Sequence, residues 1–282
     1  MLSADSNSVT RQLIEIRPSR RLLNLELGSV WRYRELLCFL IWRDLKIRYK
    51  QAAIGVGWAI IQPLFAVLIF TAVFGYFAHI PSDGLPYPVF AYAGLLPWTY
   101  FSEAFRRAGT GLVDDSELIR KIYFPRLIIP LAMVVAPMVD LFASLLILLP
   151  FLAWYGIFPT ANIVFLPIFL FLAMILALAL GLWLGPTNVR FRDVKHTIPF
   201  LIQIWMYASP VVYPLSIVPE RLRLLYSLNP MVGVIQGFRW ALFGKDTPDF
   251  HALGLGMTLI VLASLGGLVY FKKMERFFAD VI

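Results

Sequence analysis

The sequence predicts an all-α integral membrane protein with six transmembrane helices, an N-terminal amphipathic interface helix, and short outer gate helices between spans five and six. The first observation is composition: 60% of the 282 residues are hydrophobic and 15% are charged, whereas soluble domains average about 25% charged residues. The second is a series of long apolar runs, and the third is an uneven placement of Lys and Arg. A soluble chain of this size could not remove so much apolar surface from water, because folding buries only part of it.

The apolar runs have the length of membrane-spanning helices, about 20 residues for the roughly 30 Å of hydrocarbon in a bilayer. The predicted spans cover residues 58–78, 87–105, 127–155, 163–185, 197–215 and 251–271. Several contain prolines, which membrane helices tolerate because neighbouring groups satisfy the freed carbonyls. Pro210, Pro214 and Pro219 cluster more densely. We therefore expect a broken or re-entrant element after the fifth run, followed by one or two short helices in residues 216–250.

Lys and Arg residues predict the orientation, since cytoplasmic connections carry an excess of both. The segment before residue 58, the connections after the second and fourth runs, and the tail after residue 271 hold 21 of the 25. The opposite side holds 4. Six spans with both termini in the cytoplasm fit this division, whereas five or seven would split the basic segments between the two sides. The net charge of +8 is thereby assigned to membrane orientation and not to nucleic-acid binding.

The N-terminal segment is predicted to stay outside the bilayer. Residues 1–30 are polar or mixed and contain no apolar run of signal-peptide length, so the first span is expected to be a retained signal anchor. At about 100° per residue, Arg43 and Lys46 share one side of the following helix and Leu45 lies opposite. Such a helix suits an anionic headgroup layer or a soluble partner. The predicted domains are 1–30 (cytoplasmic extension), 31–56 (interface helix) and 57–282 (six-span permease domain).

Catalytic motifs are missing from the sequence. It has no G-x-x-x-x-G-K-[ST] phosphate loop and no G-x-S-x-G elbow. His79, His196 and His251 stand far apart and do not join Cys or carboxylates at metal-ligand spacing. We therefore expect a transport subunit that is not an enzyme and holds no cofactor or metal of its own.

Charged residues within the apolar runs are few. Asp140 lies near the middle of the third run, and two interpretations are open: a pathway or interhelical hydrogen-bonding residue, or a carboxylate drawn towards an interface in a proline-broken segment. Glu103, Arg106 and Arg107 lie at the cytoplasmic end of the second run, at a spacing that lets them pair with one another.

Aromatic side chains make up 15% of the chain and crowd three of the runs. One interpretation is lipid-facing packing with aromatic belts at the interfaces. The other is a passage whose rings stack against sugar rings, which offers contact area without fixed charge. The channel-lining candidates on the second interpretation are Phe70, Phe74, Phe77, Tyr92, Trp98, Tyr100, Trp205 and Tyr207.

A series of short stretches resembles, in order and spacing, the membrane permeases of type-2 ATP-binding-cassette exporters. The stretches are RDLKIRYK at 43–50, GVGW at 55–58, QPL at 62–64, GLLPW at 94–98, LIRKIYFP at 118–125, NVRFRDV at 188–194, SPVVYP at 209–214 and LNP at 228–230. The match runs from about residue 31 to the end of the chain. It is most similar to the subgroup that exports cell-surface polysaccharides, namely O-antigen, capsule or teichoic acid.

The resemblance implies a pore made by two copies of the chain, with two separate ATPase subunits that hold ATP and Mg²⁺. It also implies a bacterial cytoplasmic (inner) membrane location, contact with membrane lipids, and a glycan on undecaprenyl diphosphate as substrate. The implied ATPase-interface candidates are Arg43, Asp44, Lys46, Arg48, Lys50, Glu117, Arg120, Lys121 and Tyr123. The implied outer gate candidates are Pro210, Tyr213, Pro214, Asn229 and Pro230. The basic residues of 43–50 could instead guide a diphosphate headgroup, and both roles are open.

Two rival functions follow from the same residues. One is a permease of this family that moves a drug or a small lipid. The other is a membrane-embedded transferase or polymerase acting on lipid-linked sugars, which should show acidic and basic catalytic residues in its loops. The sequence contains no such set, so export is the expected function.

Overall fold

A computed structural model describes residues 27–50, 57–245, 247–275 and 278, and every regular element in these residues is helical. The principal helices are α1 (Leu27–Arg32), α2 (Arg34–Lys50), α3 (Gly57–Phe70), α4 (Tyr87–Asp114), α5 (Ser116–Lys121), α6 (Ile128–Val135), α7 (Met138–Trp154), α8 (Leu166–Arg190), α9 (Val194–Tyr207), α10 (Glu220–Ser227), α11 (Pro230–Phe243) and α12 (Phe250–Glu275). A π-helical stretch, Thr71–Phe77, extends α3, and short 3-10 turns, Ala161–Phe165 and Leu215–Ile217, precede α8 and α10.

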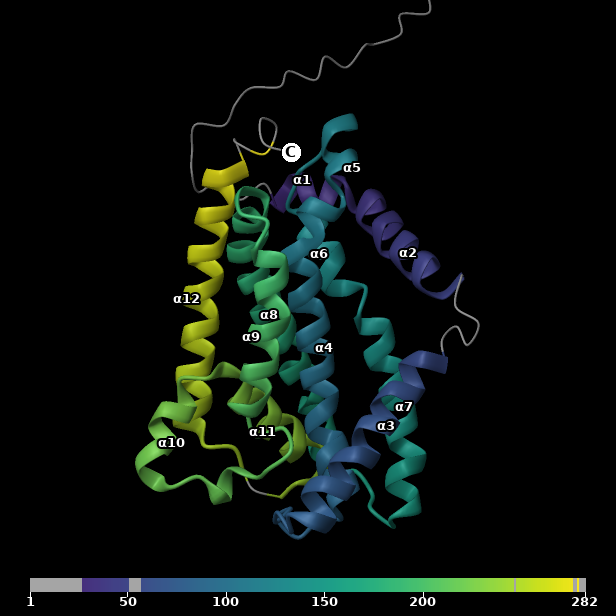
Figure 1. Cartoon of the computed structure of the whole chain (residues 1–282), viewed down its shortest axis with the longest axis vertical. Helices are drawn as coiled ribbons and strands as arrows, with labels where there is room; N and C mark the ends of the chain where they lie inside the picture. The colour runs from purple at the N-terminus through teal and green to yellow at the C-terminus, as the bar shows by residue number, and fades with distance from the viewer. Residues whose placement is uncertain (1–26, 51–56, 246, 276–277, 279–282) are drawn as a thin grey trace, which may run out of the picture.

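The long helices run side by side along the longest axis, and the two ends of the bundle differ (Figure 1). One end carries α1, α2 and α5, with α5 standing out beyond the long helices; the other carries α10 and α11. We call these the α5 end and the α11 end. The charge pattern predicts that the α5 end is cytoplasmic.

Helix α4 forms the centre of the bundle and packs against α3, α6, α7, α8, α9 and α11. Its closest partner is α8, because small residues meet where the two helices approach. A Cβ atom added at Gly181 would lie 2.3 Å from the Cβ of Ala108, and one at Gly185 would lie 3.2 Å from the Ala108 carbonyl oxygen. Small residues four apart are a common way for membrane helices to pack closely.

Among the residues that the structure describes, three helical segments are long and apolar enough to cross a bilayer: Ile128–Trp154, Ala161–Arg190 and Phe250–Glu275. Ile61–Phe77 is a shorter apolar helix. They coincide with the third, fourth, sixth and first predicted spans. The second and fifth predicted spans fall on α4 and α9, so the total of six crossings stays a prediction.

Two predicted spans differ from the helices that contain them. Helix α4 continues past residue 105 to Asp114, because its charged residues pair with each other and with α2, as described below. Helix α9 ends at Tyr207, eight residues before the predicted end at 215, and the chain then turns through residues 208–214. The predicted interface helix corresponds to α1 and α2, while residues 51–56 and most of the predicted extension lie outside the described residues.

Candidate functional site

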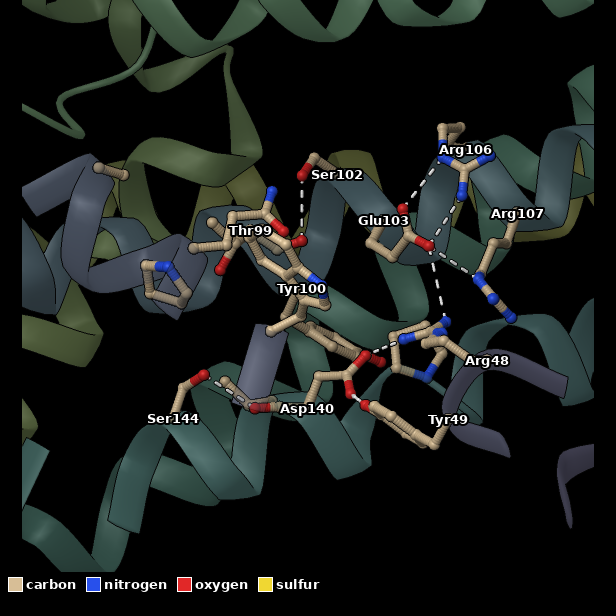
Figure 2. Close-up of a pocket in the computed structure, with 16 residues that line it drawn as sticks. Arg48, Tyr49, Thr99, Tyr100, Ser102, Glu103, Arg106, Arg107, Asp140 and Ser144 are labelled. Carbon is tan, nitrogen blue, oxygen red and sulfur yellow. Dashed lines mark hydrogen bonds and ion pairs between the residues drawn. The ribbon is translucent and has the colours of Figure 1, made fainter. Parts of the chain in front are cut away.

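A cavity of about 550 Å³ opens between four helices of the bundle. Helices α2, α3, α4 and α7 supply its walls, and we call it the α2–α7 cavity (Figure 2). Its lining residues are Arg48, Tyr49, Trp58, Gln62, Pro63, Ala66, Thr99, Tyr100, Ser102, Glu103, Arg106, Arg107, Pro137, Asp140, Leu141 and Ser144. The lining combines three guanidinium groups and two carboxylates with aromatic and aliphatic walls.

Asp140 is the contact that joins α2 to α7. Arg48 donates a hydrogen bond from Nη1 to one carboxylate oxygen of Asp140, and the Tyr49 hydroxyl donates to the other. Arg48 also lies 3.6 Å from Glu103 on α4, and Figure 2 shows the Arg48 side chain between the two acids. Of the two interpretations of Asp140, the structure therefore supports interhelical hydrogen bonding.

Glu103 accepts hydrogen bonds from the two arginines of the next turn of α4. Arg106 donates two hydrogen bonds to its carboxylate, at 3.0 and 2.8 Å, and Arg107 donates one at 2.8 Å. Arg107 also donates to Asp44 of α2 at 3.0 Å. This arrangement keeps α4 helical through its charged residues, and it ties α2 to α4.

A further ion pair lies at the α5 end, where Arg43 of α2 meets Asp115, the residue between α4 and α5. One guanidinium nitrogen reaches both carboxylate oxygens, at 2.8 and 2.7 Å. Burial lowers the pKa of Arg43, but the hydrogen bonds and charges of Asp115 and Asp44 together more than compensate, so the pKa lies above its ordinary value. The ion pair couples the position of α2 to that of α5.

The sequence-predicted ATPase contacts divide into two groups. Lys46, Lys50, Glu117, Arg120, Lys121 and Tyr123 are exposed. Arg43, Asp44 and Arg48 instead turn towards the bundle. The single basic face expected for α2 is thus divided, because carboxylates on neighbouring elements attract its arginines. Three apolar side chains of α2, Phe39, Trp42 and Ile47, are exposed.

Helix α5 presents the most exposed charges of the site. Lys121 donates a 2.6 Å hydrogen bond to Glu117, and the two side chains are 71% and 81% exposed. This hydrogen bond lowers the pKa of Glu117. Ile119 and Phe124 are buried and anchor the segment to the bundle, so α5 offers its polar side to solvent on a fixed base.

The channel-lining candidates are also divided. Tyr92, Trp98 and Tyr100 are buried within the protomer, and the Tyr92 and Tyr100 hydroxyls donate to the carbonyls of Ser144 and Val134. The rings of Tyr92 and Trp98 are thus covered by neighbouring helices of the same protomer, while Tyr100 borders the α2–α7 cavity. A channel lining stays a prediction for all eight candidates. Phe70 and Phe74 are half-buried and pack on each other; Phe77 and Tyr207 are exposed; and Trp205 is half-buried.

Asn229, an outer gate candidate, forms a hydrogen-bonded cluster with Trp205, Ala208, Ser209 and Met231 at the α11 end, which we call the Asn229 cluster. Its side-chain oxygen accepts hydrogen bonds from Trp205 Nε1 at 2.8 Å and from the Met231 amide at 3.1 Å. Its amide nitrogen donates to the Ala208 carbonyl at 3.1 Å and to Ser209 Oγ at 2.8 Å. Asn229 thus caps α11, where Pro230 is the first residue, and fixes the end of α9 and the following turn.

The other outer gate candidates, apart from Pro230, lie in the turn that follows α9. Tyr213 donates to the Tyr207 carbonyl at 2.8 Å and its hydroxyl lies 3.1 Å from that of Tyr226. Pro210 and Pro214 are buried in the turn. The Pro210 carbonyl accepts a 2.8 Å hydrogen bond from Arg239.

Arg239 on α11 is a functional candidate that the sequence analysis missed. It also donates to the carbonyls of Val211 at 2.6 Å and Phe90 at 3.2 Å, and its guanidinium carbon lies 3.5 Å from the centre of the Phe90 ring. A Cβ at Gly94 would lie 2.3 Å from the Val211 oxygen, so glycine leaves room for this contact. A lone arginine in an apolar segment was the signal that could have indicated it.

In the described residues, no group of three or more His, Cys, Asp or Glu is placed to hold a metal ion. The contacts described above at both ends are ion pairs and hydrogen bonds between helices. Such contacts can hold helices in one arrangement and allow another.

Comparison with known proteins shows the family to which the chain belongs. A family model described as "ABC-2 type transporter" matches residues 35–243. The chain belongs to the ABC-2 type transporter family. The matched segment of this ABC-2 type transporter protein begins in α2 and ends with α11, so it contains the α2–α7 cavity, α5 and the Asn229 cluster.

Individual relatives of this ABC-2 type transporter protein carry more specific names. The chain is 30% identical over 253 residues to the O-antigen export system permease protein RfbA of Myxococcus xanthus, covering 88% of this chain and 96% of that protein. It is 25% identical over 249 residues to the protein of the same name from Klebsiella pneumoniae, covering 88% and 95%. It is 24% identical over 246 residues to the polysialic acid transport protein KpsM of Escherichia coli, covering 84% and 92%.

Proposed function

We propose that the chain is the transmembrane subunit of an ATP-driven exporter that moves lipid-linked cell-surface polysaccharide, O-antigen above all, across the bacterial cytoplasmic membrane. The names of its relatives support this substrate class, since O-antigen export and polysialic acid transport are both polysaccharide transport. The near-complete coverage of those relatives supports a shared architecture.

The observation that carries the ATP-driven mechanism is the exposed, charged α5 at one end of the bundle. Glu117 and Lys121 point into solvent there, and the Arg43–Asp115 ion pair links α5 to α2. A separate ATPase subunit, holding ATP and Mg²⁺, would contact α5 and move α2 with it. Packed helices transmit such displacements as rigid bodies.

Two copies of the chain and two ATPase subunits would form the working transporter. Exposed apolar side chains on α3 and α9, including Phe65, Leu68, Phe200 and Ile204, suit contacts with a second copy or with lipid. Both termini would lie in the cytoplasm with six spans between them, and the Asn229 cluster would form the outer gate.

Deletion of the gene in its own host tests the function. We expect loss of surface polysaccharide and accumulation of the lipid-linked glycan inside the cell, with both restored by the wild-type gene. Intact surface polysaccharide together with sensitivity to toxic compounds would favour an exporter of drugs or small lipids. Glycan elongation by the purified chain alone would favour a membrane-embedded transferase.

A further inference from the structure

The α2–α7 cavity carries more hydrogen-bond donors than its own acceptors use. Three guanidinium groups line it against two carboxylates. Arg48 Nη2 is buried and donates no hydrogen bond within the described structure, although a carboxylate oxygen of Glu103 lies 3.6 Å away; a buried donor without a hydrogen bond costs free energy. Arg106 has a side chain that is 44% exposed, so its guanidinium is accessible. A ligand with negatively charged acceptor oxygens would satisfy these donors.

The position and walls of the cavity favour a lipid headgroup as the source of those oxygens. The cavity lies where α2, the predicted interface helix, meets α3, α4 and α7. Trp58, Pro63, Ala66 and Leu141 give it apolar walls beside the arginines. The planar fork of arginine matches phosphate oxygens, which it binds with charge-assisted hydrogen bonds.

The geometry points to a site for the phosphate-bearing headgroup of a lipid in the α2–α7 cavity, with Arg48 and Arg106 as its contacts. Arg48 already binds Asp140, so a bound phosphate competes with this carboxylate for the same guanidinium. Binding would thereby weaken the contact that joins α2 to α7. This inference rests on the proposed function for its physiological ligand, the diphosphate end of a lipid-linked glycan; a membrane phospholipid presents the same chemistry.

The competition predicts opposite effects for two substitutions at one ion pair. Arg48→Gln removes the phosphate contact and should weaken headgroup binding about tenfold, as expected for one charge-assisted hydrogen bond. Asp140→Asn removes the competing charge and should strengthen binding. Arg106→Gln, at a more exposed position, should weaken binding without breaking the α2–α7 contact. Arg190→Gln is the matched control, because Arg190 is exposed at the end of α8 and lies against Phe191, outside the cavity.

Native mass spectrometry of the purified full chain in detergent measures this binding. The probes are a polyprenyl diphosphate, the uncharged polyprenol of the same length, and phosphatidylglycerol. We expect the diphosphate to bind more tightly than the polyprenol, with the order Asp140→Asn, wild type, Arg48→Gln from tight to weak. Equal binding of phosphatidylglycerol, with the same dependence on Arg48, would support the site and identify membrane phospholipid as its ligand.

Equal binding of diphosphate and polyprenol would overturn the inference, as would a loss that is the same in Arg190→Gln and Arg48→Gln. Weaker binding in both Arg48→Gln and Asp140→Asn would also overturn it, since that result indicates damage to the fold and not competition. The assay needs no ATPase and no export. If deletion of the gene abolishes surface polysaccharide but the purified chain does not bind the diphosphate, this site alone is removed. If the chain binds the diphosphate but deletion leaves surface polysaccharide intact, the proposed function alone is removed.

Discussion

Asp140 and Arg239 show how polar side chains are accommodated within an apolar bundle. A charge inside a membrane protein is costly unless a partner compensates it. Asp140 accepts hydrogen bonds from Arg48 and Tyr49 of α2, whereas Arg239 donates to three backbone carbonyls near the α11 end. Each residue joins segments far apart in sequence, so each holds together helices that would have to move relative to one another in a transport cycle.

The Arg43–Asp115 pair gives a prediction at this scale. Asp115→Asn leaves the guanidinium of Arg43 with Asp44, at 3.2 Å, as its remaining negative partner. Because the side chains of Arg43 and Asp115 are largely buried, we expect a loss of about 1–2 kcal/mol of stability. The measurement is the thermal unfolding midpoint of the purified chain in detergent. Glu117→Gln is the control: it breaks an exposed ion pair, and exposed pairs contribute little, so its midpoint should stay at the wild-type value. Equal midpoints for all three proteins would contradict this account of the pair.

The apolar residues of the sequence were enough to predict where the long apolar helices lie, but not which partners their polar side chains contact. The run at 58–78 corresponds closely to Gly57–Phe77, because an uncharged run of that length has few alternatives to a helix in lipid. Asp140, in contrast, was left between two interpretations. Its partner Arg48 lies 92 residues away, and hydropathy carries no information on contacts at that separation.

At the scale of the elements, α9 and α11 depend on the turn between them. From apolarity the sequence predicted a span that continues to residue 215, and from the prolines it predicted a break in this region. The helix does break there, since α9 ends at Tyr207. Asn229 then supplies the hydrogen bonds that the broken helix lacks, to the Ala208 carbonyl and Ser209. The proline cluster thus indicated where regular structure ends, while the residue that stabilises the ending could be found only from the fold.

Asn229→Ala tests whether this turn closes the proposed channel. The substitution removes hydrogen bonds to Trp205, Ala208, Ser209 and Met231, and we expect it to loosen the α11 end by about 1–3 kcal/mol. Ion leak through vesicles containing the purified chain is the measurement, and it should rise. In the control, Ser227→Ala, the lost bond is local to α10, and leak should not change. A wild-type leak in Asn229→Ala would remove the gate assignment.

The whole molecule has two chemically different ends, and the proposed mechanism depends on that difference. The α5 end holds ion pairs that tie α2 to α4, α7 and the start of α5. The α11 end is fastened by the uncharged side chain of Asn229 and by Arg239. Force applied to α5 could therefore pass to the membrane helices through charged contacts. Length, apolarity and charge distribution indicated this polarity of the bundle, but the central place of α4 and the inward pairing of Arg43 and Arg48 required the three-dimensional structure.

Site-specific photocrosslinking to the co-expressed ATPase tests the central claim, that a separate motor drives the bundle from its α5 end. A photoreactive residue at Tyr123, 72% exposed beside α5, is compared with one at Trp154, 86% exposed at the far end of α7. We expect an ATPase adduct at position 123 and none at position 154. An adduct at position 154 with none at 123, or polysaccharide export that persists when the ATPase is absent, would contradict it.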